Sequence, residues 1–279
     1  MKRKINLIYA AIIAVLLASC SPPFYQIYKV APTEKLIDID NYLVYEDDNC
    51  KVVYDFWSQG GNIRFSFYNK TDKNIYLNLE ESFFIFNGTA YDYFKDIVRT
   101  YTKISSAKIS STTASQSVTG TNYLGLRQTN TAQEISSIGF TASSGFSISY
   151  NEQKVICIPS KTSKIITEYK ITESLHRDCD LFQYPTRNQI KSKKFSKTES
   201  PIIFSNRIAY TIEQSDNLIK FENEFYIAEI SNYPENVLLE FRQEEFCGQT
   251  RSSATRYIKN ASPDKFYIRY TKGDDRWKH

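Results

Sequence analysis

The residues best suited to chemistry are a histidine and a cysteine three positions apart, His176 and Cys179. A cysteine thiolate acts as a nucleophile when a base lies beside it and an oxyanion hole faces it, and spacing in the sequence supplies neither. The only other histidine is His279, and the chain has no Cys-x-x-Cys pair, so an ordinary zinc site is not expected. We therefore predict no catalytic residues, no metal ligands and no cofactor.

Two acidic clusters, Asp47-Asp48-Asn49 and Asp274-Asp275, could offer oxygen ligands to calcium. Neither has the spaced ligands of an EF-hand loop, and polar turn residues explain both. A hydrolase that acts through carboxylates dispersed along the chain stays open, because the sequence does not give the distance between two carboxyl groups.

Five cysteines are present, and one of them, Cys20, follows an apolar N-terminal segment. The other four are Cys50, Cys157, Cys179 and Cys247. An even number of cysteines in an exported chain is compatible with two disulfides. Buried free thiols are the alternative, and the sequence leaves both open.

Trp57 is the one candidate for ligand stacking, because it precedes Ser58-Gln59-Gly60-Gly61 at the end of a predicted strand. An exposed indole at such a place can stack on a sugar ring. Core packing is the commoner environment of tryptophan, so the glycan-stacking role is a hypothesis only.

The N-terminus has the three parts of an export signal. Lys2, Arg3 and Lys4 precede an uncharged, mostly apolar run over residues 7–18. This run is too short to cross ~30 Å of hydrocarbon, which takes ~20 apolar residues, so it is typical of a signal peptide. No later stretch approaches the length of a transmembrane helix.

The end of this run, Leu17-Ala18-Ser19-Cys20, resembles the lipobox of bacterial lipoproteins. The resemblance implies a signal peptide over residues 1–19, cleavage before Cys20, and a lipid on the Cys20 sulfur that holds the protein to a membrane. Long acyl chains on one residue anchor a protein durably. Residues 20–40, with Pro22, Pro23 and Pro32, are predicted to form a lipidated tether.

In the sorting rule of Gram-negative lipoproteins, an aspartate after the cysteine favours the inner membrane, whereas this chain has Ser21. We therefore expect the outer membrane. Acidic residues, which send lipoproteins of some gut bacteria to the cell surface, are missing just after Cys20, so a periplasm-facing position is favoured.

The formal net charge falls from +4 to +1 when residues 1–19 are removed, because they hold three basic and no acidic residues. A nearly neutral chain lacks the clustered cations that neutralise phosphates, so nucleic acid is not an expected partner. The basic stretch over residues 186–200 could face anionic lipid or an acidic partner, although a solvated loop explains it more simply.

Alternation with a period of two dominates from residue 42 onward. Residues 52–56 form one strand, and residues 63–67 and 75–79 form two more, which we expect to pair as a hairpin. Asn87-Gly88 predicts a second hairpin, because a type I′ turn needs positive φ at both central residues. Further strands are expected over residues 154–158, 165–171, 202–204, 208–212, 225–230, 237–241 and 266–270.

Short strands without alternating helices indicate antiparallel pairing. The predicted fold is all-β: an antiparallel β-sandwich over residues 41–279, immunoglobulin-like, with minor helix, such as a short helix within residues 175–190. Residues 105–149 are rich in Ser and Thr. This excursion is either a long binding loop or a set of weakly apolar edge strands.

Residues 63–93, together with Val155-Ile156-Cys157-Ile158-Pro159, resemble a group of uncharacterised lipoproteins from gut Gram-negative bacteria. This resemblance implies no activity. The leading hypothesis is a non-enzymatic, membrane-anchored module of the cell envelope that binds an envelope protein or glycan. A structural subunit with an open sheet edge and a hydrolase acting on envelope glycans or polymers are the alternatives.

Overall fold

The structure is a computed structural model. It describes residues 22–33, 36–96, 98–106, 143–151, 153–213, 215, 217–250 and 253–278. The predicted signal peptide, Cys20 and most of the Ser/Thr-rich excursion lie outside these residues. Among the described residues, no helix has the length and apolar character needed to cross a bilayer.

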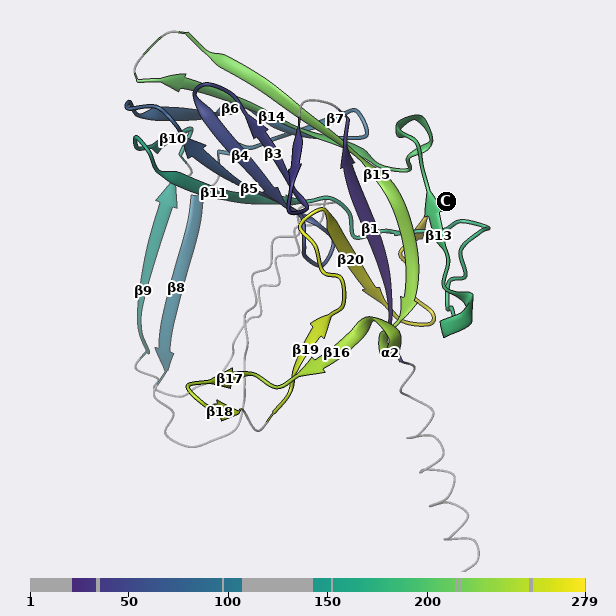
Figure 1. Ribbon diagram of the computed structural model, residues 1–279. Helices are drawn as coiled ribbons and strands as arrows, with labels where there is room; N and C mark the ends of the chain where they lie inside the picture. The colour runs from purple at the N-terminus through teal and green to yellow at the C-terminus, as the bar shows by residue number, and fades with distance from the viewer. Residues whose placement is uncertain are drawn as a thin grey trace, which may run out of the picture.

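Most of the described chain forms two antiparallel sheets, which make up the upper part of Figure 1. The eight-stranded sheet has the order β10 (Val155–Ile158), β6 (Ile75–Phe86), β14 (Ile203–Ile212), β15 (Ile219–Pro234), β1 (Phe24–Pro32) and β20 (Lys265–Tyr270), with β7 (Thr89–Asp92) beside β6 and β13 (Ser192–Lys194) beside β15. The five-stranded sheet has the order β11 (Ser163–Lys170), β5 (Asn62–Asn69), β4 (Cys50–Asp55), β3 (Tyr42–Glu46) and β2 (Ile37–Ile39).

Aromatic side chains fill the space between the two sheets. Tyr54 and Phe56, from the end of β4, meet Phe225 of β15 with ring centroids 4.9 Å and 5.2 Å apart. Phe204 of β14 stacks on Phe225 at 5.2 Å. Large flat side chains suit this environment, because each one removes much apolar surface from water. The prediction of an all-β sandwich with minor helix is confirmed.

The Asn87-Gly88 hairpin is also confirmed. β6 and β7 pair from Phe83 to Asp92, and the two turn residues have φ values of 45° and 82°. Both values lie in the left-handed region that a type I′ turn requires.

The predicted hairpin of residues 63–67 with residues 75–79 is wrong. Residues 63–67 lie in β5 and residues 75–79 in β6, and these strands belong to different sheets. Each strand buries one face in the shared core, so the alternation is the same as in a hairpin. The polar run between them is a corner that crosses the sandwich.

Asn69 holds this corner together. Its buried side-chain amide donates to the carbonyl oxygens of Lys73 at 2.7 Å and Ile158 at 3.0 Å. Its backbone N–H donates to Thr162 O at 2.9 Å. Thr162 lies in the second crossing, from β10 to β11, so Asn69 joins both connections between the sheets through its side chain and its backbone N–H.

The predicted tether over residues 20–40 is wrong for its described part, and the sandwich begins before residue 41. β1 lies between β15 and β20 in the eight-stranded sheet, and Tyr28 and Val30 are buried. Two features concealed this strand in the sequence. Pro32 stands at the strand end, where proline is tolerated, and an inward-facing position holds the polar Gln26.

Smaller elements extend from the two sheets (Figure 1). β8 (Val98–Ser106) and β9 (Ser143–Asn151) pair with each other. The helix α2 (Glu235–Leu238) leads from β15 into β16 (Leu239–Arg242), β17 (Glu245–Phe246), β18 (Gln249–Thr250) and β19 (Thr255–Ile258). We call residues 239–250 and 253–258 the arm. In the arm β16 pairs with β19, and β17 pairs with β18.

The short helix predicted within residues 175–190 is reduced to one 3-10 turn, η1 (Arg187–Gln189). The segment starts instead with β12 (Leu175–His176), which pairs in parallel with β21 (Trp277–Lys278). A second 3-10 turn, η2 (Lys197–Glu199), follows β13. Pro185 lies between β12 and η1, and it disfavours a longer helix there.

Candidate functional site

Trp57 lies on the outer side of β20, outside the aromatic core. The chain from Ser58 to Gly60 runs along the β20 edge: Gly60 N donates to Tyr267 O at 2.8 Å, and Tyr267 N donates to Ser58 O at 3.2 Å. These bonds bring the indole of Trp57 to 5.2 Å from the ring of Tyr267, between ring centroids. Trp57 and Tyr267 are both half-buried.

The turn that places Trp57 requires glycine. Gly61 has a φ of +69°, and a Cβ atom there would lie 2.7 Å from the ring of Phe266. No side chain fits in that space, and left-handed φ is costly for residues other than glycine. The pair Gly60-Gly61 therefore fixes the position of Trp57.

Polar groups surround these rings. Tyr25 continues the row, with its ring centroid 5.9 Å from that of Tyr267, and its hydroxyl donates to Glu235 at 3.4 Å. Burial, and then the Glu235 carboxylate, raise the pKa of Tyr25. The exposed Arg269 stands beside Tyr25 on β20, and its backbone N–H donates to the side chain of Gln59 at 3.1 Å. Tyr25 is buried, at 6% exposure, so we call the half-buried Trp57 and Tyr267 the aromatic face.

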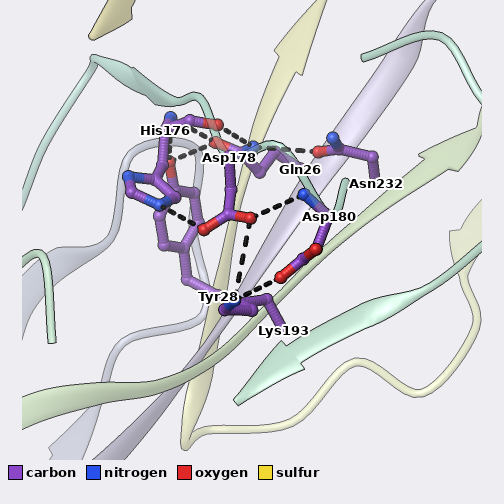
Figure 2. A network of polar contacts seen from close by, with 7 residues as sticks. All are labelled: Gln26, Tyr28, His176, Asp178, Asp180, Lys193 and Asn232. Carbon is purple, nitrogen blue, oxygen red and sulfur yellow. Dashed lines mark hydrogen bonds and ion pairs between the residues drawn. The ribbon is translucent and has the colours of Figure 1, made fainter. Parts of the chain in front are cut away.

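A second polar cluster lies on the inner side of the sheet, where the segment from residue 171 to residue 184 crosses β1 and β15. We call this segment the strap. Gln26 of β1 lies at the centre of the polar cluster (Figure 2). The Gln26 amide donates to His176 O and to the Asn232 side chain, both at 2.9 Å, and Gln26 Oε1 accepts from His176 N at 2.7 Å.

Further hydrogen bonds tie the strap to the sheet. Tyr28 donates to Ser174 O at 3.2 Å, and Asn232 donates to Phe182 O at 2.9 Å. Gln26, Tyr28 and Asn232 are each at most 2% exposed. A buried polar side chain without a partner is destabilising, and each of these has one, so the cluster fixes the strap in place.

The side chain of His176 points away from this cluster, against Phe195, with the ring centroids 5.7 Å apart. Its Nε2 lies 3.9 Å from the Asp178 carboxylate, which is an ion-pair distance and too long for a hydrogen bond. Burial lowers the pKa of His176, and Asp178 opposes this shift only in part. His176 is therefore mainly neutral at neutral pH.

Asp178 and Asp180 share the cation of Lys193 (Figure 2). The hydrogen bond from Lys193 lowers the pKa of Asp180. Beside them is an open hollow of about 600 Å³, lined by residues 177–179, 181–184 and Gln189. A carboxylic acid that protonates a leaving group needs a raised pKa, and Asp180 is shifted in the opposite direction.

The four cysteines after Cys20 are free thiols. Cys50 is buried, and burial raises the pKa of its thiol, so it is a poor nucleophile. Cys157, Cys179 and Cys247 are exposed on β10, the strap and the β17–β18 turn. No pair of these four cysteines is joined, so the disulfide alternative is not the arrangement found, and of the buried free thiols expected otherwise only Cys50 is buried. Cys179 lines the hollow, whereas the ring of His176 packs against Phe195.

The acidic clusters have structural roles in the described chain. Asp47 accepts hydrogen bonds from the backbone N–H groups of Asn49 at 2.8 Å and Cys50 at 2.7 Å. Asp274 binds the guanidinium group of Arg276. Within the described ranges, no group of three or more His, Cys, Asp or Glu side chains is arranged to hold a metal ion.

Sequence reasoning missed Gln26 and Asn232, which are 206 positions apart and meet only in the folded sheet. The alternation Phe24, Gln26, Tyr28 was the one available signal, since these three residues share a face of a strand. Comparison with known protein families, curated proteins and solved structures finds no match to this chain. Its function must therefore be argued from its own residues.

Proposed function

We propose that this protein is a lipoprotein of the cell envelope, held to the outer membrane by a lipid on Cys20 and facing the periplasm. Its sandwich binds another envelope component without catalysis, and the aromatic face is the binding surface. The observation that carries this proposal is the half-buried Trp57, whose ring lies tilted beside that of Tyr267 on the outer side of a sheet, with the centroids 5.2 Å apart.

A glycan is the partner that fits this surface best. The flat faces of indole and phenol rings contact the C–H groups of a sugar, and nearby polar groups bond its hydroxyls. Arg269 supplies donors, and Glu235 and Gln59 supply acceptors. An envelope protein is the second possible partner, since tyrosine, tryptophan and arginine also dominate protein interfaces.

The anchor is tested by intact mass. We expect the wild-type protein from membranes to lack residues 1–19 and to carry the mass of a lipid, and we expect Cys20→Ala to lose both changes. Cys179→Ala is the matched control, because it removes an exposed cysteine elsewhere and should keep the lipid. An unchanged processed mass in Cys20→Ala would overturn the lipoprotein proposal.

The binding surface is tested by co-sedimentation with purified peptidoglycan sacculi. Trp57→Ala should weaken binding by about tenfold or more, as loss of a central aromatic contact does. Trp277→Ala is the control, since that indole packs on Tyr270 at 5.1 Å, away from the face. Equal losses in both variants would rule out the aromatic face, and no binding by the wild type would argue against this glycan.

The same experiment tests the alternative of a glycan or polymer hydrolase. Such an enzyme would release soluble fragments from the sacculi, and the release would stop in a variant of one carboxylate. Asp178→Asn is the variant to use, because Asp178 lines the hollow and pairs with Lys193 at 3.9 Å. The proposal of a non-enzymatic module predicts no release by either protein.

A further inference from the structure

The arm carries the most exposed large apolar side chains of the described residues. Phe246, in β17, is 81% exposed, and Phe241, in β16, is 64% exposed. Among the other described residues, most aromatic rings are buried or half-buried, and the exposed ones, Phe182 at 47% and Tyr42 at 40%, are more covered than the two on the arm. Two exposed phenylalanines on one small projection indicate a surface that is covered by something apolar.

Arginines accompany the rings of the arm. The guanidinium group of Arg256 lies over the ring of Phe241, 5.8 Å from its centroid, and that of Arg242 lies 5.4 Å from the centroid of Tyr257. Arginine and aromatic side chains together suit the boundary between hydrocarbon and water. Arg242 is paired with Glu240, which leaves the guanidinium group of Arg256 to reach the phosphates while the apolar parts enter the lipid.

The position of the arm brings it close to the proposed anchor. Glu235 N, at the start of α2, donates to Pro23 O at 3.1 Å, so the beginning of the chain is bound to the element that leads into the arm. Figure 1 shows α2 beside the start of β1 in the lower part of the view, with the arm running sideways from α2 to β17 and β18. Only two residues separate Cys20 from Pro23, and three residue steps span at most about 11 Å.

We propose that the arm lies on the membrane, with Phe241 and Phe246 inserted among the lipid headgroups and upper acyl chains. This inference rests on the proposed lipid at Cys20. A lipid there would keep Pro23 within about 11 Å of the lipidated residue, because three residue steps cannot reach further, and α2 is hydrogen-bonded to Pro23. The bilayer is then the nearest apolar phase, and the arm adds a second contact to the acyl chains, which also limits rotation of the sandwich.

The test uses the processed full-length protein in vesicles of phosphatidylethanolamine and phosphatidylglycerol whose acyl chains carry bromine, a short-range quencher of tryptophan. Phe246→Trp places a reporter on the arm and keeps an aromatic ring at an exposed position. Ile165→Trp is the matched control, because Ile165 is 57% exposed on β11, in the upper part of Figure 1.

We expect bromine to quench the added tryptophan of Phe246→Trp by about twofold or more relative to that of Ile165→Trp. Equal quenching in samples that carry the lipid mass would overturn the arm proposal and leave the anchor standing. A sample without the lipid mass would overturn the anchor and, with it, the inference that rests on it.

Discussion

The sandwich and the arm use aromatic side chains in opposite ways. In the sandwich, Phe56, Phe204 and Phe225 are at most 1% exposed and pack ring against ring. On the arm, Phe246 is 81% exposed. The arm is also built from strands of two to four residues, which bury little surface by themselves. The buried rings of the sandwich therefore supply most of the stability of the protein, whereas the exposed rings of the arm contribute little to it.

The largest expected difference is in the free energy of unfolding, between an alanine variant of a sandwich phenylalanine and one of an arm phenylalanine. Phe225→Ala should lower the free energy of unfolding by about 3–5 kcal/mol, because it removes buried surface and leaves a cavity. Phe246→Ala should change it by less than about 0.5 kcal/mol, as exposed substitutions do. Urea unfolding of both variants in detergent-free solution measures the two values. Similar losses would show that the arm is part of the cooperative core.

Two glycines at positive φ sharpen the comparison. A Cβ atom added at Gly61 would lie within 3 Å of Phe266 and Ile171. A Cβ atom added at Gly248, in the β17–β18 turn, would have no atom within 4 Å. Gly248→Ala should cost about 1–2 kcal/mol, the penalty of left-handed backbone alone. Gly61→Ala adds overpacking and should cost about 2–4 kcal/mol in total.

Thermal unfolding of the two glycine variants under one set of conditions checks this order. Gly61→Ala should also weaken binding at the aromatic face, since the turn positions Trp57. A larger loss of stability in Gly248→Ala would contradict the assignment of the arm as the less packed region.

The smallest expected effect is a pH dependence of the unfolding free energy, which arises from the strap and the sandwich and not from the arm. Burial lowers the pKa of His176 in the folded protein, so the unfolded chain takes up the proton first as the pH falls. Unfolding free energy should therefore decrease from about pH 7.5 to about pH 5.5, through the ordinary range of histidine. In His176→Asn this part of the decrease should be missing, while the arm, which has no histidine, contributes nothing to it.

Urea unfolding at the two pH values measures the difference between wild type and His176→Asn. If both proteins lose the same stability between the two values, protonation of His176 is not the cause. A histidine stabilised in its charged form would instead make the unfolding free energy increase as the pH falls.

The sequence predicted elements that depend on local chemistry and missed those that depend on distant partners. Asn87-Gly88 identifies its hairpin because both residues tolerate positive φ. The β17–β18 turn has the same geometry at Cys247, with a φ of 52°, and Gly248. It was not predicted, because cysteine has no comparable preference for that turn.

Alternation also has a limit as a predictor. It places Phe65 and Leu77 in the core correctly, at 1% and 0% exposure, but it does not show which sheet each strand joins. The candidate site shows the same limit. Trp57 could be selected from its type and its glycine turn, whereas Tyr267 joins it only through the backbone hydrogen bonds between β20 and residues 58–60.

The pairing of β1 has a consequence for the order of folding. Its neighbours, β15 and β20, lie roughly 200 or more positions later in the chain, so on a growing polypeptide β1 stays unpaired until nearly all residues have been synthesised. Such non-local contacts make folding slow. If the proposed signal peptide directs export in extended form, this delay is an advantage, because the first strand cannot close the sheet before the last one has emerged.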